Sequence, residues 1–345
     1  MRVTLSDVAK RAGVGLSTAS RALNQSGYVS ESVKQRVFAA VAELDYYPDM
    51  LAQQLATDQR RTLTLFEVGN TGNVQSPQDI EGFFGPLSQA LGQVIAAAGY
   101  ELNIGFQRLD EHHPAEVLAR IRRSRSSAAI VLFIRTELDE RMRSELASID
   151  VPAVSINCPL QSLGIPTILV DIRGAAFAAT KHLIDNGFSR IAHIQGPADL
   201  PATEERIAGY TRAMEAANLP CRMVPGGFGP DLGYEAMQEM LTNSEPPDAV
   251  FCANDLAAIG ALRAIQERGL KVPQDVGLVG FDDILVSRYV VPSLTTIRQP
   301  QERTGTEAGR AILDALAGKT PPETISIPCE LVIRESSVFT AQESH

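Results

Sequence analysis

The sequence has few cysteines and no long apolar run. Four cysteines are scattered over 345 residues, which fits neither a disulfide framework nor the paired spacing of a zinc site. No stretch reaches the roughly 18 consecutive apolar residues of a membrane span, and the first residues contain no apolar signal segment. We therefore expect a cytoplasmic protein with reduced cysteines and no membrane partner. The cysteines are Cys158, Cys221, Cys252 and Cys329.

Motifs of catalysis and metal binding are also missing. The five histidines form no metal spacing, and neither GxxxxGK[ST] nor GxGxxG occurs in the sequence. The run GGFG at residues 226–229 is interpreted as a turn. We therefore expect that the protein is not an enzyme and needs no metal or other cofactor.

The charge of the chain is unevenly distributed. The formal net charge is −10. Residues 1–40 nevertheless carry six basic and two acidic side chains, a net charge of +4. A small basic region on an acidic chain can attract phosphates locally while the rest of the protein avoids them. A length of 345 residues predicts two or three folded units.

Residues 4–46 have the pattern of three short helices. Thr4 is placed to cap the first helix, and Gly13 stops it. The second helix is predicted over residues 16–23, and Ser30 is placed to cap the third. The apolar residues of the third helix share one face, which predicts a small bundle.

From residue 62 onward, apolar strands alternate with amphipathic helices. Alternating βα units imply parallel sheets with helices on both faces. Eight predicted strands are many for one sheet, and we expect the chain to cross between two lobes near residues 157–166. Two doubly wound lobes place a ligand cleft between the carboxyl ends of their strands.

Small residues mark a helix-turn-helix near the N-terminus. Ala9, Gly13 and Ala19 have the spacing at which two helices meet at a tight turn. The stretch TLSDVAKRAGVGLSTASRAL and its continuation to residue 56 resembles the DNA-binding domain of the lactose-repressor (LacI/GalR) family. The resemblance implies that the second helix enters the major groove. The DNA-contacting residues that it implies are Thr4, Leu16, Ser17, Thr18, Ser20, Arg21, Asn24, Tyr28 and Leu55.

Two of these residues have a specific expected role. The planar fork of Arg21 suits O6 and N7 of guanine, although a surface ion pair is the alternative. Leu55 takes the place of the family's hinge-helix leucine that wedges into the minor groove, and a modest dimer contact is the alternative. Gly15 and Ala19 depart from the family pattern, which has a Ser or Thr cap and a Val there.

The remainder of the chain resembles the effector domain of the same family and the periplasmic sugar-binding proteins. The matching blocks are VDIRGA at 170–175, ERIAGY at 205–210, CANDLAAIGALRA at 252–264, VPQDVGLVGFDD at 272–283 and LTTIRQP at 294–300. Asn254 and Asp282 each follow a predicted strand, where an amide and a carboxylate suit sugar hydroxyls. Helix or loop capping is the alternative for both. The effector-binding residues predicted in this way are Phe83, Phe84, Arg135, Asp171, Arg206, Asn254 and Asp282.

Some cleft positions depart from the family pattern. Ile172 stands where an Asn is usual, and Asn157 with Cys158 stands where Asp and Arg are usual. Arg135, Arg206 and Arg173 could give the cleft a positive lining. One hypothesis is therefore an anionic effector such as a sugar acid or phosphate. The alternative is that these arginines pair with carboxylates of the cleft.

These observations predict a small all-α helix-turn-helix headpiece and an α/β periplasmic-binding-protein-like sensor of two doubly wound parallel-sheet lobes. The expected domains are residues 1–47 (headpiece), 48–60 (hinge helix), 61–159 with 294–323 (N-terminal lobe), 160–293 with 324–340 (C-terminal lobe) and 341–345 (tail).

The resemblance implies a transcriptional repressor that binds pseudo-palindromic double-stranded operator DNA as a homodimer and responds to a small-molecule effector. Control by a protein partner and activation by a corepressor remain alternatives. Because the end of the chain carries no heptads, we expect a dimer and not a tetramer.

Overall fold

The chain divides into two compact units, Met1–Arg60 and Arg61–His345. The computed structural model describes residues 3–23, 28–46, 61–69, 84–108, 128–134, 138–198 and 200–338. Within these ranges, no helix combines the length and the apolar character that crossing a bilayer requires.

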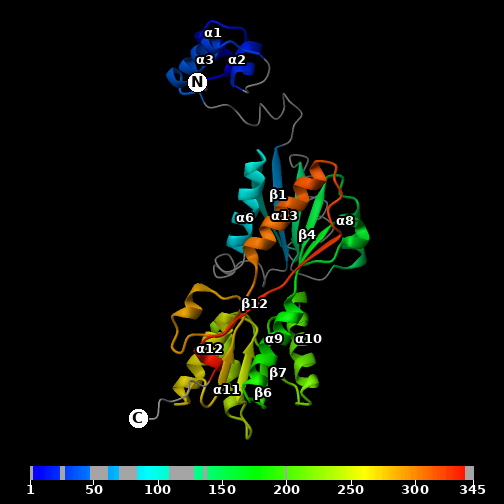
Figure 1. The fold of residues 1–345 in the computed structure, drawn as a ribbon, viewed down its shortest axis with the longest axis vertical. Coiled ribbons are helices and arrows are strands. Elements are labelled where there is room, and N and C mark those ends of the chain that lie inside the picture. The colour runs from blue at the N-terminus through cyan, green and yellow to red at the C-terminus, as the bar shows by residue number, and fades with distance from the viewer. Residues whose placement is uncertain are drawn as a thin grey trace. The chain divides into compact units, whose positions relative to one another are not determined.

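The described residues of the first unit form a bundle of three helices. They are α1 (Leu5–Ala12), α2 (Leu16–Leu23) and α3 (Glu31–Glu43) (Figure 1). Thr4 caps α1 as predicted: its hydroxyl accepts from the backbone N–H of Asp7, and the Asp7 carboxylate accepts from the backbone N–H of Thr4. The helix ends at Gly13, whose φ of 65° lies in the left-handed region that glycine adopts without a Cβ penalty.

Small residues allow the three helices to pack closely. Ala19 and Ala22 of α2 are fully buried together with Val8 of α1 and Val37 of α3. Ser30 occupies the N-cap position of α3, as predicted, but its hydroxyl makes no cap hydrogen bond. That hydroxyl lies 3.3 Å from the hydroxyl oxygen of Ser32 instead.

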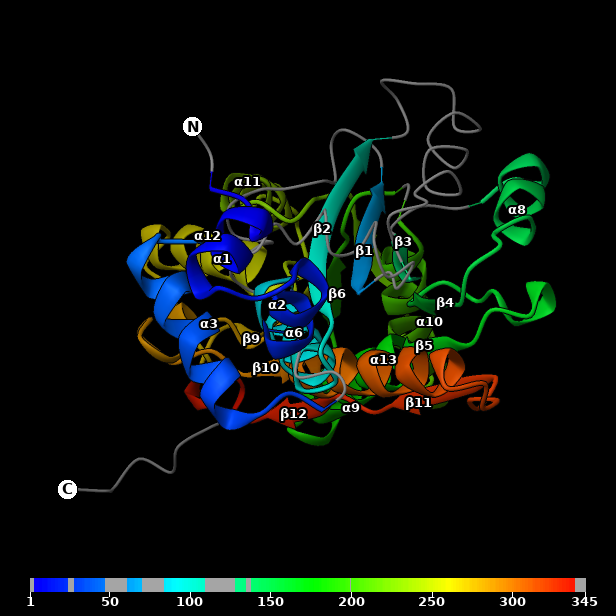
Figure 2. The same ribbon diagram turned by 90° about the horizontal axis from the view of Figure 1, so that it is seen from above.

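The second unit contains a first lobe built on a six-stranded sheet. The strand order is β11 (Thr324–Ile327), β5 (Thr167–Val170), β4 (Ala153–Ile156), β3 (Ala129–Ile134), β1 (Thr62–Gly69), β2 (Glu101–Arg108). All neighbouring strands are parallel, and Figure 2 shows β2, β1 and β3 side by side.

Helices cover both faces of this sheet because its strand residues alternate in direction. Leu63 and Leu65 pack against α6 (Gly85–Ala97) and α13 (Gln301–Leu316). Phe66 packs toward α8 (Glu140–Ala147) on the other face.

The second lobe is built on a four-stranded parallel sheet. Its order is β7 (Arg222–Val224), β6 (Ile191–Ile194), β8 (Ala249–Cys252), β9 (Gly277–Val279). One face carries α9 (Ile172–Asp185) and α10 (Pro201–Ala216), and the other carries α11 (Pro230–Leu241) and α12 (Asp255–Glu267). An antiparallel pair, β10 (Thr296–Arg298) and β12 (Glu330–Val332), lies beside β9. The predicted fold class, a helix-turn-helix unit with two doubly wound parallel lobes, is confirmed.

The predicted crossing between the lobes is wrong. Residues 157–166 connect β4 to β5 within the first lobe, and their apolar members Leu160 and Ile165 are buried against its sheet. The chain crosses only after Val170, where β5 ends. Two lobe assignments change with it: β11 pairs with β5 in the first lobe, and β10 lies beside β9 in the second.

Candidate functional site

The exposed face of α2 is the candidate DNA-reading surface. The helix begins directly after Gly15, whose carbonyl accepts from the backbone N–H groups of Thr18 and Ala19 at 2.9 and 3.0 Å. Leu16 is 55% exposed, an unusual environment for a leucine, and Ser17 beside it is also exposed. Thr18 and Ser20, on the same helix, are half-buried.

Arg21 is exposed on the same helix. Its Nε donates to the Ser17 carbonyl oxygen at 3.2 Å, which directs the guanidinium along the helix surface. Among the described carboxylates, none forms an ion pair with Arg21. The alternative of a surface ion pair is therefore not found in the described part of the unit.

The other predicted DNA contacts differ in their environment. Tyr28 is 92% exposed and so presents its whole ring and hydroxyl to solvent. The hydroxyl of Thr4 is engaged by Asp7 at 2.7 Å, so it serves the helix cap. Asn24 and Leu55 lie outside the described residues.

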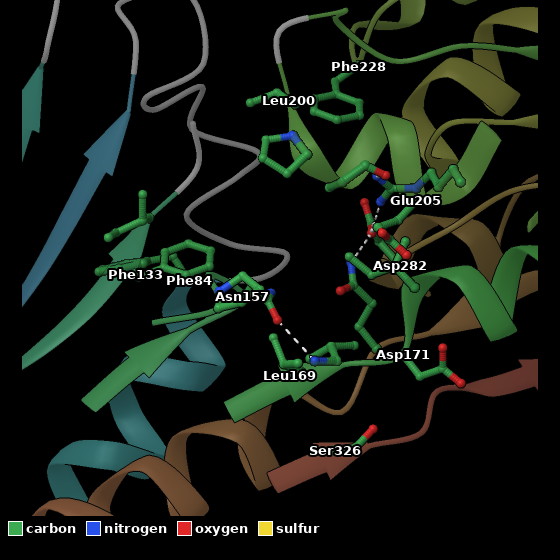
Figure 3. Close-up of a pocket in the computed structure, with 18 residues that line it drawn as sticks. Phe84, Phe133, Asn157, Leu169, Asp171, Leu200, Glu205, Phe228, Asp282 and Ser326 are labelled. Carbon is green, nitrogen blue, oxygen red and sulfur yellow. Dashed lines mark hydrogen bonds and ion pairs between the residues drawn. The ribbon is translucent and has the colours of Figure 1, made fainter. Parts of the chain in front are cut away.

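A cavity of about 360 Å³ lies between the lobes of the second unit, at the carboxyl ends of the strands. Figure 3 shows Phe84, Phe133 and Asn157 on the side of the first lobe, facing Phe228 and Asp282 on the side of the second. The cavity is also lined by Asp171, Ile172, Glu205, Arg206 and Gln299.

Arg206 of α10 is held in a buried position on the wall of this cavity. Its guanidinium carbon lies 4.1 Å from the ring centre of Phe281 and 5.7 Å from that of Phe228. Its Nη1 donates to the Ala202 carbonyl at 3.2 Å, and its Nη2 lies 3.9 Å from Oδ1 of Asp282. The charge of Arg206 is therefore matched by a carboxylate inside the cavity.

Asp282 projects into the cavity from a loop of unusual backbone conformation. Its φ is 115°, and that of Asp283 is 54°. The backbone N–H of Asp282 donates to the Ile297 carbonyl at 2.7 Å, and its Oδ1 accepts from Nε2 of Gln299 at 2.6 Å. The predicted residues Asp282 and Arg206 are thus brought together on the cavity wall.

Asp171 and Asn157 line the cavity while also holding local backbone. Asp171 caps α9 by accepting from the backbone N–H of Gly174 at 2.8 Å. Asn157, which has a φ of 57°, accepts from the backbone N–H of Val170 at 3.0 Å. Ile172 also lines the cavity, where it adds an apolar surface in place of the family's usual amide.

The side chain of Asn254, predicted to contact the effector, is engaged by local backbone in this structure, and its predicted role stays a prediction. Its Oδ1 caps α12 by accepting from the backbone N–H of Ala257 at 2.9 Å, and its Nδ2 donates to the Phe228 carbonyl at 3.0 Å. Asn254 is 5% exposed and does not line the cavity. Asn254 therefore caps α12 and supports the backbone at Phe228, as the capping alternative expects.

Asp255 also serves the scaffold. Its carboxylate accepts from the backbone N–H of Ile284 at 2.9 Å and from the hydroxyl of Thr296. Burial, with a further contribution from Asp282, raises the pKa of Asp255 well above its usual range. The residue is fully buried and makes no part of the cavity lining.

The described lining does not have the positive charge that the three arginines suggested. Arg173 pairs with Glu205 through two contacts of 2.8 and 3.0 Å, and Arg206 lies beside Asp282. The charged groups of the described lining are one guanidinium and three carboxylates, those of Asp171, Glu205 and Asp282. Arg135 lies outside the described residues.

Phe84 is confirmed as a lining residue, whereas Phe83 lies outside the described residues. Sequence reasoning missed Phe228, which was taken only as part of a turn, and Gln299. An aromatic residue in a glycine-rich turn after a strand was the available signal for Phe228. No local signal marked Gln299, because its place depends on the pairing of β10.

His193 lies in β6, where the positive charge of Arg206 acts on its imidazole. Its Nδ1 is 2.9 Å from the Phe251 carbonyl, so this nitrogen carries the proton, and its ring stacks on Phe251 with centres 4.8 Å apart. Burial lowers the pKa of His193 to about 4, and the positive charge of Arg206 acts in the same direction. His193 is therefore neutral at physiological pH.

Comparison with known proteins finds a matching family model for each of the two units. Residues 4–49 match the model of bacterial regulatory proteins of the lacI family, and residues 180–337 match a periplasmic binding protein-like domain. The regulator GalR of Salmonella typhimurium strain SL1344 is 36% identical over 345 residues, covering 99% of this chain and 97% of GalR. The repressor PurR of Escherichia coli O1:K1 / APEC is 31% identical over 339 residues, covering 96% of each chain.

Two solved structures are also similar to this chain over nearly its whole length. The lac repressor dimer bound to operator and the anti-inducer ONPF has a TM-score of 0.84 at 26% identity, covering 98% of this chain and all of that one. A complex of the transcriptional regulator CelR with cellobiose has a TM-score of 0.69 at 31% identity, covering 97% of this chain and all of that one.

Proposed function

This chain belongs to the lacI family of bacterial regulatory proteins, and from that membership we propose that its effector is a neutral sugar held between the two lobes. The protein is a helix-turn-helix transcriptional repressor whose affinity for operator DNA depends on a small-molecule effector. It binds DNA as a dimer.

The charge of the cavity lining carries the proposal. The single guanidinium of the described cavity lining, that of Arg206, lies 3.9 Å from a carboxylate oxygen of Asp282. An anionic effector would bring a further negative charge close to the carboxylates of Asp171 and Glu205 as well. A neutral sugar avoids this repulsion, because its hydroxyls can donate to the carboxylates and accept from the guanidinium.

The shape of the cavity also fits a sugar. Its volume of about 360 Å³ lies in the range that small-molecule sites occupy. Phe84 and Phe228 offer aromatic faces, on which the apolar side of a sugar ring can pack. The description of CelR as a complex with cellobiose is consistent with an uncharged sugar.

For the DNA-binding unit, the exposed residues of α2 support a recognition helix in the major groove. Leu16, Ser17 and Arg21 are the exposed side chains of this helix that would reach base edges or nearby phosphates. A hinge helix within residues 48–60, with Leu55 as a minor-groove wedge, remains a proposal from the resemblance. Because genomic DNA is the partner, we expect the protein to act in the cytoplasm.

A thermal-shift screen of the full-length protein tests the effector class. The panel contains D-glucose, D-galactose, D-ribose and cellobiose, with D-gluconate, D-galacturonate and glucose 6-phosphate as anionic counterparts. A ligand at 100 times its dissociation constant adds about 2.7 kcal/mol of stability, which gives a clear shift in Tm. We expect a neutral sugar to shift Tm and its acid to have little effect.

Two variants locate the binding site. Asp282→Ala should abolish the shift, because this carboxylate lies on the cavity wall. Asp185→Ala should preserve it, since Asp185 is an exposed carboxylate on α9 that pairs with Lys181. A shift with the anionic compounds alone would overturn the proposal.

A further inference from the structure

Three chain segments connect the lobes, and two of them lie close to the loop that carries Asp282. The connections run from β5 to α9, from β10 to α13 and from β11 to β12. Relative movement of the lobes must bend these segments, because they are the covalent links between the two sheets. A group that holds two of them together can therefore control the movement.

Asp283 is such a group. Its side chain is only 2% exposed, and its carboxylate contacts three arginines. Arg298, the last residue of β10 before the chain crosses to α13, donates to Oδ2 at 2.8 Å. Arg334, which follows β12, donates to Oδ1. Arg288 contacts the same carboxylate at 3.4 Å from the neighbouring short helix.

Arg298 extends the contact to the third connection. Its Nη1 donates to Glu330, the first residue of β12, at 2.8 Å. Arg298 therefore joins Asp283 to both the β10–α13 and the β11–β12 connections. Burial raises the pKa of Asp283, but the hydrogen bonds and charges of Arg334 and Arg298 together outweigh burial and lower the pKa overall. The carboxylate is thus ionised when it meets these arginines.

The same loop carries the cavity residue Asp282. Asp282 and Asp283 are consecutive residues with positive φ, so the chain turns sharply and sends the two carboxylates in different directions. The backbone N–H of Asp282 donates to Ile297, and that of Asp283 donates to the hydroxyl of Thr296 at 3.3 Å. Asp282 and Asp283 are therefore both tied through their backbone to β10, so a displacement of Asp282 would act on both.

We propose that Asp283 is a positioning residue that couples occupancy of the effector cavity to the β10–α13 and β11–β12 connections, which its partner Arg298 joins. It does not line the cavity and acts through the loop it shares with Asp282. The inference deepens the proposed function and rests on the effector binding between the lobes. It predicts that loss of the Asp283 contacts separates effector binding from its effect on DNA.

The test compares three full-length variants with a matched control. Asp283→Asn and Arg298→Gln each remove a contact to a lobe connection, and Arg334→Gln removes the contact between Asp283 and the segment that follows β12. Arg288→Gln removes an arginine from the same carboxylate, but Arg288 belongs to the local helix and to no connection. Any effect due only to weakening the buried ion cluster should therefore appear in the control as well.

Two affinities are measured for each protein. Calorimetry gives the affinity for the sugar of the panel, D-glucose, D-galactose, D-ribose or cellobiose, that shifts wild-type Tm most. Fluorescence anisotropy gives the affinity for an operator selected from random DNA by the wild-type protein, with and without that sugar. We expect the sugar to change wild-type operator affinity by about tenfold, a common size for allosteric coupling.

In Asp283→Asn, Arg298→Gln and Arg334→Gln we expect this change to fall below about twofold while sugar affinity changes by less than about threefold. Arg288→Gln should keep the wild-type response. The inference is overturned if Asp283→Asn keeps the full response, or if Arg288→Gln loses it to the same degree. If Asp283→Asn does not fold, Arg298→Gln and Arg334→Gln still test the inference.

Hydrogen exchange without any sugar gives an independent readout. Asp283→Asn should speed amide exchange in residues 296–301 and 330–336, whereas Arg288→Gln should affect only residues 284–289. Unchanged exchange in the connections would contradict the inference. If no sugar of the panel binds, the proposed effector class fails, and the exchange comparison still tests the coupling residue by itself.

Discussion

At the scale of single residues, Arg21 is the side chain expected to contribute most to base recognition. It is exposed on α2, and its contact with the Ser17 carbonyl limits the directions its guanidinium can take. Arg21→Ala should cost about 1 to 3 kcal/mol of operator binding and relax discrimination at one base position, because a double donor to guanine is lost. Anisotropy with an operator and its single-base variants measures both effects.

Arg21→Lys is the informative companion, because it keeps the charge and loses the planar fork. It should retain more affinity than the alanine variant and still fail to discriminate the base. An equal loss on every DNA sequence would instead assign Arg21 to a phosphate.

His193 makes the stability of the protein depend on pH. The pKa of its imidazole is about 4 in the folded protein and close to 6.5 when the chain unfolds. The unfolded state therefore binds the extra proton, so stability falls as pH decreases from about 7 toward 4. This group should lower the unfolding free energy by about 2 kcal/mol between pH 7.5 and pH 5.

His193→Gln should remove that part of the pH dependence, since glutamine does not titrate and its amide can still donate to the Phe251 carbonyl. Denaturant unfolding of both proteins at pH 7.5 and 5 measures the difference. Parallel pH dependence in the two proteins would show that the buried imidazole is not its source.

The sequence predicted the cavity residues unevenly, and the reason is local geometry. Asp282 and Asn254 both follow a parallel strand, so position alone led to the same expectation for each. A helix begins directly after Asn254, and the backbone N–H of Ala257 occupies its side-chain oxygen. After Asp282 the backbone turns through positive φ, which leaves that side chain on the cavity wall. Only the three-dimensional structure distinguishes the environment of Asp282 from that of Asn254.

At the scale of elements, two glycines of the first unit should respond in opposite ways to substitution. Gly13 ends α1 with a φ of 65°, and an added Cβ would lie 3.9 Å from Arg36, so the cost is one of backbone conformation. Gly13→Ala should destabilise the bundle by about 1 kcal/mol. Gly15→Ser should stabilise α2 by a few tenths of a kcal/mol, because serine is a better residue at a helix start.

Thermal unfolding of the helical bundle is followed by far-ultraviolet circular dichroism on the full chain. It gives the order of unfolding temperatures of the wild type, Gly13→Ala and Gly15→Ser. We expect Gly15→Ser to unfold at the highest temperature and Gly13→Ala at the lowest. The reverse order would show that the left-handed backbone of Gly13 does not determine the stability of α1.

The helices and strands were predicted from the sequence more completely than the elements against which they pack. The helix bounds 16–23 and the alternating βα pattern follow from local periodicity, which the structure preserves. The segment at residues 157–166 was misassigned because its prolines and glycine are typical of linkers. Burial of Leu160 and Ile165 depends on a sheet that this segment covers, and periodicity carries no such information.

At the scale of the whole molecule, strand pairing joins residues far apart in the chain. β5 pairs with β11 in register from Thr167 and Thr324 to Val170 and Ile327. The first lobe therefore cannot be completed until the last part of the chain has returned to it. This long-range pairing explains why the lobe boundaries could not be predicted from the sequence, although the two-lobed class could.

The exposed apolar residues of the second lobe give the last prediction. Leu285 is 70% exposed, Tyr289 73% and Val291 79%, all in or just after one short helix. Single exposed apolar residues are ordinary, but a cluster of large ones favours an interaction surface. Because the similar lac repressor binds operator as a dimer, we expect this cluster to contact a second copy of the chain.

Tyr289→Glu places a charge in the cluster and should shift the protein from dimer to monomer in sedimentation at micromolar concentration. Operator affinity should fall with it, because a monomer offers one recognition helix to a two-part site. Met223→Glu is the matched control, since Met223 is 40% exposed on β7 at the opposite edge of the sheet from β9. A dimer that survives Tyr289→Glu would place the dimer contact elsewhere.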